Sequence, residues 1–173
     1  MPPLSLILGG ASSGKSSFAE ALLTGAGRAP VYLATARAWD DETAAKIAAH
    51  RADRAGAGWR TVEEPLDLPA ALRAVAPTEA VLIDCATMWL TNVMLDGADL
   101  ATAEAGLLAA LASCPAPVVI VSNEVGLGIV PDNALARAFR VAQGGLNGRL
   151  AAQAGLVVVV MAGLPLVLKG ALP

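Results

Sequence analysis

The chain has 173 residues, of which 55% are hydrophobic and only 3% aromatic, and it carries 12 basic against 15 acidic side chains. This length fits a single domain, residues 1–173, whose core we expect to be built from small aliphatic side chains. The slight acidity, with a pI near 5.1, offers no broad positive field for a nucleic-acid backbone, so we expect no nucleic-acid partner.

The two cysteines and the uncharged segments bear on the setting of the protein. Cys85 and Cys114 show neither a metal-ligand spacing nor a disulfide framework, and the N-terminus lacks a signal-peptide pattern. The uncharged stretch 155–168 is interrupted by Gly163 and Pro165 and is shorter than the roughly 20 residues of a spanning helix. We therefore expect a cytoplasmic protein with no membrane span.

Short apolar runs recur along the chain and predict buried strands. They are LSLIL at 4–8, VYLAT at 31–35, AVLID at 80–84, PVVIVS at 117–122 and LVVVVMA at 156–162. Each run is continuously apolar rather than alternating, which is typical of strands that are covered on both faces. The predicted fold class is α/β, with a mostly parallel central sheet flanked by helices.

Longer alanine-rich segments between these runs predict helices that begin near Lys15, Asp41, Leu66, Thr87, Ala101 and Asn133. Pro131-Asp132, before the last helix, indicates a turn and an N-cap. Glycines at 144, 145 and 148 each cost about 1 kcal/mol of helix stability relative to alanine, so we expect a kink or break there. The final segment, 164–170, can add an edge strand, because Pro165 is disfavoured at the centre of a sheet.

The most specific pattern is LILGGASSGKSSFAE, in which residues 9–16 read G-x-x-x-x-G-K-S between a predicted strand and a predicted helix. This is the context that a phosphate-binding P-loop requires, because glycines let backbone N–H groups approach phosphates and the helix adds its positive end. We expect Lys15 to reach the β- and γ-phosphates and Ser16 to ligate Mg²⁺. The predicted nucleotide-binding residues are Gly9, Gly10, Ala11, Ser12, Ser13, Gly14, Lys15 and Ser16.

Acidic and amide side chains follow two of the later strands. Asp84 ends the run AVLID, where ligands of open α/β sheets gather, so its carboxylate can hold Mg²⁺ through water. The alternative is that Asp84 caps the next helix. Asn123 and Glu124 follow PVVIVS at the same edge, and either a functional role or a plain loop surface fits them.

The only histidine lies in DDETAAKIAAHRADR, residues 40–54. If Asp40 or Asp41 caps a helix, His50 shares a stripe with Arg54, so cations that can hold phosphate oxygens flank the imidazole. No second histidine or cysteine stands at ligand spacing, which argues against a metal site. On these residues alone, an incidental histidine on a solvated helix face is an open alternative.

Taken together, these segments resemble the bifunctional adenosylcobinamide kinase and adenosylcobinamide-phosphate guanylyltransferase family of cobalamin biosynthesis. The resemblance runs nearly end to end, through GGASSGKSSFAEAL, YLATA, DDETAAKIAAHRADR, WRTVEEP, LIDCATMWLTN, VSNEVGLGIVPDNALARAFR and AGLPLVLK. It implies a three-layer, RecA-like P-loop NTPase fold and a homotrimer.

The resemblance also implies two reactions. In the first, the γ-phosphate of ATP or GTP passes to the hydroxyl of adenosylcobinamide. In the second, His50 attacks the α-phosphate of GTP, releases pyrophosphate and carries GMP to adenosylcobinamide phosphate. A neutral imidazole is a good nucleophile near pH 7. Lys15 and Mg²⁺ would neutralise the departing pyrophosphate, and Arg51 and Arg54 are candidates for the charge on the guanylyl group.

Further nucleotide contacts are implied by the same resemblance. They come from Ala34, Thr35 and Ala36, from Arg51, Ala52, Asp53 and Arg54, from Glu63 and from Asp84. Glu63 can accept from the N1–H and amino group of guanine, which adenine lacks; a solvated acidic pair with Glu64 is the alternative.

The chain departs from the family pattern at a few positions. Ser12 stands where arginine is common, Ala49 where a second histidine is frequent, and Asp84 where glutamate is frequent. Gly145 and Gly148 stand where we expect larger polar residues. These departures bear on reaction rates and on corrinoid contacts, but His50, Lys15 and Ser16 are unchanged.

Two other functions fit the residues. One is an ordinary P-loop kinase of small molecules in which His50 is structural. The other is a non-catalytic, RecA-like module that switches between nucleotide states and binds a partner.

Overall fold

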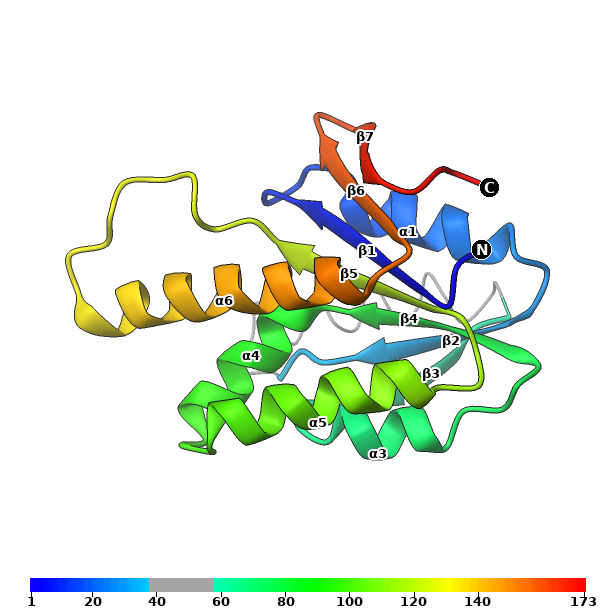
Figure 1. Cartoon of the computed structure of the whole chain (residues 1–173), viewed down its shortest axis with the longest axis horizontal. Coiled ribbons are helices and arrows are strands. Elements are labelled where there is room, and N and C mark those ends of the chain that lie inside the picture. Colours follow the sequence, from blue (N-terminus) through cyan, green and yellow to red (C-terminus); the bar gives the residue numbers. More distant parts are fainter. Residues whose placement is uncertain (38–57) are drawn as a thin grey trace.

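A single central sheet with helices on both faces forms the framework of the molecule (Figure 1). The computed structural model describes residues 1–37 and 58–173. Within them the sheet has the order β3-β2-β4-β5-β1-β6-β7. The strands are β1 (Leu4–Gly9), β2 (Ala29–Ala34), β3 (Arg60–Glu63), β4 (Glu79–Asp84), β5 (Val118–Asn123), β6 (Leu156–Met161) and β7 (Leu164–Lys169).

Every neighbouring pair in this sheet is parallel except β6 and β7. The predicted α/β class with a mostly parallel sheet is therefore confirmed. So is the edge position of the last strand: β7 pairs with β6 alone, and Pro165 lies where no inner ladder needs its missing N–H.

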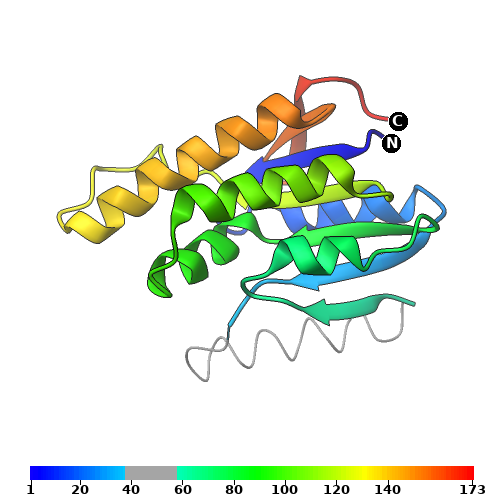
Figure 2. The same cartoon turned by 60° about the horizontal axis from the view of Figure 1, so that its bottom comes forward.

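The helices divide into two layers, as Figures 1 and 2 show. Of the helices in the described residues, only α1 (Lys15–Thr24) packs on one face of the sheet, through Ala19 and Leu23. The other face is covered by α3 (Leu68–Arg73), α4 (Ala86–Leu95), α5 (Leu100–Ser113) and α6 (Ala134–Gln153). The helix predicted near Asp41 falls at 38–57, outside the described residues.

The strand residues alternate between two hydrophobic clusters, one on each side of the sheet. Leu6, Ile83 and Ile120 pack under the four-helix layer, whereas Ile7 and Leu82 pack under α1. All five side chains are fully buried. Burial on both faces explains why the strands read as unbroken apolar runs.

The prediction of a kink at the glycines of α6 was wrong, because this helix is continuous over 20 residues. Its inward face carries Gln143, Leu146, Asn147 and Leu150, all buried. Tertiary contacts of that face outweigh the roughly 3 kcal/mol that three glycines cost relative to alanine. The predicted cap also shifts by one residue: the Asn133 side chain, not Asp132, accepts from the Ala136 N–H at 2.8 Å.

One strand had no counterpart in the sequence prediction. The strand β3 is only four residues long, RTVE, and three of the four are exposed. It lies at the edge of the sheet beside β2, so it lacks the apolar run that identified the inner strands.

No helix within residues 1–37 and 58–173 is long and apolar enough to cross a bilayer.

Candidate active site

The P-loop links β1 to α1 at the carboxyl edge of the sheet, the edge at which the parallel strands end. Gly9 ends β1, and a Cβ built there would lie 2.4 Å from Ser13 Oγ and 2.7 Å from the Val160 carbonyl oxygen. Gly14 has a φ of 90°, which disfavours any residue with a side chain. The Gly163 N–H donates to the Ser13 carbonyl at 2.9 Å and ties the loop to the β6–β7 turn. Gly9 is thus required by packing inside the protein, and Gly14 by its backbone conformation.

Gly9→Ala is expected to distort the P-loop, because the new methyl group meets a backbone carbonyl that cannot move cheaply. We expect the free energy of unfolding to fall by about 1–3 kcal/mol, the usual cost of overpacking, and nucleotide affinity to fall with it. Gly10→Ala is the matched control, since nothing lies within 4 Å of a Cβ at Gly10. Urea unfolding of the nucleotide-free proteins measures the difference; equal losses for the two variants would contradict the steric argument.

The start of α1 is arranged to receive an anion. Its N-cap is Gly14, which provides no side-chain hydrogen bond to the first turn, so backbone N–H groups of that turn are left for another acceptor. Lys15 lies over the loop and donates from Nζ to the Gly10 carbonyl at 3.0 Å. A fixed positive charge and free N–H groups therefore converge on one turn of backbone, as phosphate binding requires.

Asp84 ends β4 at the same edge. Ala80 and Leu82 of this strand belong to the cluster under α1, so strand alternation places the Asp84 side chain on the α1 side as well. Its Oδ2 accepts from the Tyr32 hydroxyl at 3.1 Å. The N-cap of α4 is Cys85, without a side-chain hydrogen bond. The structure thus excludes the alternative in which Asp84 caps α4.

Asp84 and the half-buried Ser16 are the residues that could hold Mg²⁺. This ion takes one or two carboxylate or hydroxyl oxygens from a protein, keeps several waters and binds substrate phosphates. One carboxylate oxygen from Asp84 and one hydroxyl oxygen from Ser16 would match that preference. No group of three or more His, Cys, Asp or Glu side chains gathers as a metal site in the part of the chain that the structure describes.

Thr35 is fully buried, and its side chain binds backbone of the neighbouring strand end. Its hydroxyl donates to the Cys85 carbonyl at 2.8 Å and accepts from the Cys85 N–H at 2.7 Å. Asn92, also fully buried, donates to the Thr35 carbonyl at 2.7 Å. Thr35 therefore fixes the turn after Asp84, while Ala34 and Ala36 beside it are half-buried. A direct nucleotide contact from these three residues stays a prediction.

Asn123 and Glu124 lie beside the P-loop. Asn123 is paired in register with Gly9, and the Glu124 N–H donates to the Gly9 carbonyl at 3.2 Å. The Oδ1 atom of Asn123 is buried, with no hydrogen-bond partner among the described residues. Both residues thus adjoin the predicted phosphate site, and their role in it stays a prediction.

A buried polar cluster behind this strand end was not predicted from the sequence. Asn147 Nδ2 donates to the Asn123 carbonyl at 3.0 Å, and the Asn123 N–H donates to Thr87 Oγ1 at 2.8 Å. The Ser122 hydroxyl donates to Asn147 Oδ1 at 2.6 Å, and Gln143 donates to Ser122 Oγ at 2.9 Å. Polar residues at four-residue spacing among the apolar positions of α6 were the available signal. The cluster fixes the end of β5 relative to α4 and α6.

Glu63 ends β3 and is exposed, in register with Ala34. Its neighbour Glu64 has a separate role, because Oε1 of Glu64 accepts from the Leu66 N–H at 3.0 Å and the Asp67 N–H at 2.8 Å. Glu64 therefore shapes the turn before α3. A role for Glu63 in recognising the base stays a prediction.

Cys85 is the buried thiol nearest to this site. Burial, and next the negative charge of Asp84, raises the pKa of the Cys85 thiol to about 11. At neutral pH the group is a thiol rather than a thiolate, so it is a poor nucleophile and a poor metal ligand.

The predicted nucleophile and its neighbours, His50, Arg51, Ala52, Asp53 and Arg54, lie outside the described residues. The structure therefore brings together the P-loop, Asp84, Asn123 and Glu124 at one edge, and leaves the placement of His50 as a prediction.

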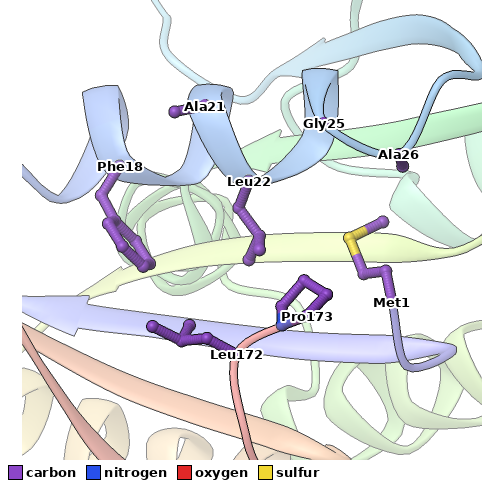
Figure 3. Close-up of a pocket in the computed structure, with 8 residues that line it drawn as sticks. All are labelled: Met1, Phe18, Ala21, Leu22, Gly25, Ala26, Leu172 and Pro173. Carbon is purple, nitrogen blue, oxygen red and sulfur yellow. The ribbon is translucent and has the colours of Figure 1, made fainter.

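A pocket of about 380 Å³ lies at the side of α1, but it is a different kind of site (Figure 3). The residues that line it are Met1, Phe18, Ala21, Leu22, Gly25, Ala26, Leu172 and Pro173. None of them has a polar side chain, so this pocket lacks the lysine and hydroxyl groups that the P-loop offers.

Comparisons with known proteins show which proteins this chain resembles. A bifunctional adenosylcobalamin biosynthesis protein, CobP, of Pseudomonas aeruginosa is 46% identical over 168 residues, which cover 95% of this chain and 96% of that protein. The bifunctional proteins named CobU of Salmonella typhimurium and Escherichia coli are 44% and 42% identical, each match covering 95% of this chain and 98% of the relative. Among solved structures, the RadB recombinase is similar with a TM-score of 0.46 at 17% identity, covering 91% of this chain and 74% of that one.

The family model described as cobinamide kinase / cobinamide phosphate guanyltransferase matches residues 5–168, from β1 to β7. That range holds the P-loop, Asp84 and His50. This chain belongs to the cobinamide kinase / cobinamide phosphate guanyltransferase family.

Proposed function

We propose that this protein is a bifunctional enzyme of cobalamin biosynthesis. It phosphorylates adenosylcobinamide with ATP or GTP, and then transfers GMP from GTP to adenosylcobinamide phosphate, giving adenosylcobinamide-GDP and pyrophosphate. The observation that carries the proposal is the P-loop of a chain that matches this family almost end to end. Lys15 over an uncapped helix start is the kind of site that a nucleoside triphosphate needs.

In the kinase step the substrate hydroxyl oxygen attacks the γ-phosphorus, the bond to the β–γ bridging oxygen breaks, and the hydroxyl proton is released. Transfer of this kind depends mainly on positioning and charge stabilisation. Lys15 supplies a positive charge at the transferring phosphate, and backbone N–H groups of residues 10–16 hold the other phosphates. Ser16 and Asp84 would hold Mg²⁺, which, when bound, neutralises negative charge on the phosphate oxygens.

In the guanylyl-transfer step an unprotonated ring nitrogen of His50 forms a bond to the α-phosphorus of GTP, and pyrophosphate leaves. A phosphate oxygen of adenosylcobinamide phosphate then attacks that phosphorus and the nitrogen–phosphorus bond breaks. Two displacements replace one difficult transfer. Arg51 and Arg54 would bind the guanylyl phosphate, and the resemblance to the family also assigns Ala52 and Asp53 to the nucleotide.

The choice of guanine in the second step is assigned to Glu63. Glu63 ends β3 in register with Ala34 at the carboxyl edge of the sheet. There its carboxylate can accept two hydrogen bonds from guanine that adenine cannot offer. Ala34, Thr35 and Ala36 would line the same part of the nucleotide site.

The setting in which the enzyme works is part of the proposal. We assign it to the cytoplasm, as a homotrimer without a nucleic-acid partner. The acidic composition, with 15 acidic against 12 basic side chains, supports the last point.

The experiment is a two-stage product assay. The protein, Mg²⁺ and adenosylcobinamide are incubated first with ATP and then with GTP, and corrinoid products are identified by mass spectrometry. We expect a gain of one phosphate followed by a gain of GMP. A phosphorylated corrinoid that never gains GMP would support the simple kinase alternative, and no modified corrinoid would favour the nucleotide-switch alternative.

A further inference from the structure

The loop that follows β5 exposes an unusual amount of apolar surface. Leu127 is 88% exposed, Ile129 97% and Val130 67%, and Leu135 at the start of α6 is 60% exposed. Residues 125–131 include no charged side chain. Large aliphatic side chains gathered in this way mark a binding surface more often than chance exposure.

This loop, residues 124–133, begins at the nucleotide site. Its first residue, Glu124, donates from its N–H to the carbonyl of Gly9, the first residue of the P-loop motif. From there the loop projects beyond the carboxyl edge and returns to the start of α6 (Figure 1). A molecule bound to the loop can therefore extend toward the phosphates.

Polar contacts fix the shape of the loop and leave its aliphatic side chains in solvent. The Arg140 guanidinium donates to the Gly126 carbonyl, and Glu124 Oε1 accepts from the Gly126 N–H at 2.6 Å. Arg137 donates to the Pro131 carbonyl at 3.0 Å and to the Asp132 carbonyl at 2.6 Å. A loop held in place from α6 loses less conformational freedom when it binds a ligand.

An apolar pocket adjoins the loop between α4 and the start of α6. It has a volume of about 250 Å³, and its lining includes Met94, Leu95, Leu135, Ala136 and Phe139. Asn133, the last residue of the loop, also lines it. The pocket therefore begins where the loop ends, at Asn133, whereas the other end of the loop adjoins the P-loop at Glu124.

We propose that this surface, formed by the loop 124–133 and the α4–α6 pocket, binds the corrin macrocycle of the acceptor substrate. The inference rests on the proposed function. A corrinoid is a broad ring with methyl-rich faces and uncharged amide side chains, so it suits the exposed aliphatic side chains of residues 125–131, a stretch that carries no charge. The pocket is too small for the whole ring and would take a peripheral group, while Leu127, Ile129 and Val130 cover a face. The substrate's hydroxyl arm would then extend toward Lys15.

The test compares two serine substitutions in the loop, Leu127→Ser and Ile129→Ser, with Leu166→Ser as control. Leu166 lies on β7 and is 59% exposed, so it matches the loop residues in chemistry but belongs to another surface. All three side chains are in solvent, and the variants are expected to fold. Equilibrium dialysis with dicyanocobinamide measures corrinoid affinity, a nucleotide titration measures GTP affinity, and light scattering measures the assembly mass.

We expect the cobinamide Kd to rise about 10-fold in each loop variant, from the loss of one buried aliphatic side chain. GTP affinity and assembly mass should stay unchanged, and the control should match the wild type. Unchanged cobinamide affinity in both loop variants would overturn the inference while leaving the proposed function intact. A fall in assembly mass with unchanged cobinamide affinity would also overturn it, since the surface would then join copies of this chain. A wild-type protein that binds no cobinamide would refute both proposals.

Discussion

Lys15→Ala is expected to lower the rates of both phosphorylation and guanylyl transfer by about 10²–10³-fold. The reason is that one ammonium group stabilises charge developing on the phosphates in both reactions, and removing one such donor typically has this effect. In the protein this group donates to the Gly10 carbonyl at 3.0 Å, in the middle of the P-loop. Steady-state assays of each half-reaction with saturating substrates measure the loss.

Lys169→Ala is the matched control for this experiment. Lys169 also donates from Nζ to backbone carbonyls, those of Ala151 and Ala152, but it lies on β7 away from the P-loop. We expect its activity to equal that of the wild type. The free energy of unfolding of Lys15→Ala should stay within about 0.5 kcal/mol of the wild type, as for most surface substitutions. Loss of only one half-reaction would show that the two reactions do not share this phosphate site.

His50→Ala is expected to separate the two activities. Guanylyl transfer should fall by at least about 10³-fold, because without the imidazole there is no nucleophile to form the covalent intermediate. Phosphorylation should change by less than about threefold, since the P-loop, Lys15 and Asp84 are untouched. The kinase rate of the same preparation is the internal control for folding. Equal rates of adenosylcobinamide-GDP formation in variant and wild type would make His50 a structural residue.

Much of the fold could be predicted because buried strands are recognisable in the sequence as apolar runs. The runs that became β1, β2, β4, β5 and β6 carry apolar residues on both faces of each strand because helices cover both faces of the sheet. The edge strand β3 has no such apolar run, since three of its four residues are exposed. The glycines of α6 led to a wrong prediction of a kink, because their low helix propensity favours a break. Long-range contacts of Gln143 and Asn147 stabilise the continuous helix instead.

The same difference between local patterns and long-range contacts decides which parts of the candidate site could be predicted. The P-loop could be read from its spacing because each residue type answers a local need, such as the positive φ at Gly14. Asp84 was placed correctly at a strand end, but the partner of its carboxylate, Tyr32, is 52 residues away, and no local pattern connects the two. The hydroxyl of Thr35 likewise binds Cys85, 50 residues on. Contacts of that kind depend on which strands become neighbours, and the sequence alone does not specify this order.

The two glycine-rich regions of the site differ in their physical role. At Gly9 the missing Cβ makes room for Ser13 and Val160, inside the protein. At Gly10 and at Gly128 a Cβ added to the backbone would meet no atom within 4 Å, so neither glycine is required by packing inside the protein.

The transfer of GMP through His50 is tested most directly by labelling the wild-type protein with GTP that carries ³²P in the α-phosphate. After incubation with Mg²⁺ and quenching in base, label should remain on the protein, be released by acid, and map to the peptide that contains His50. Adding adenosylcobinamide phosphate should move the label to the corrinoid. GTP labelled in the γ-phosphate should leave no label on that peptide. Label that maps to another residue, or product that forms with no labelled protein on the way, would contradict the mechanism.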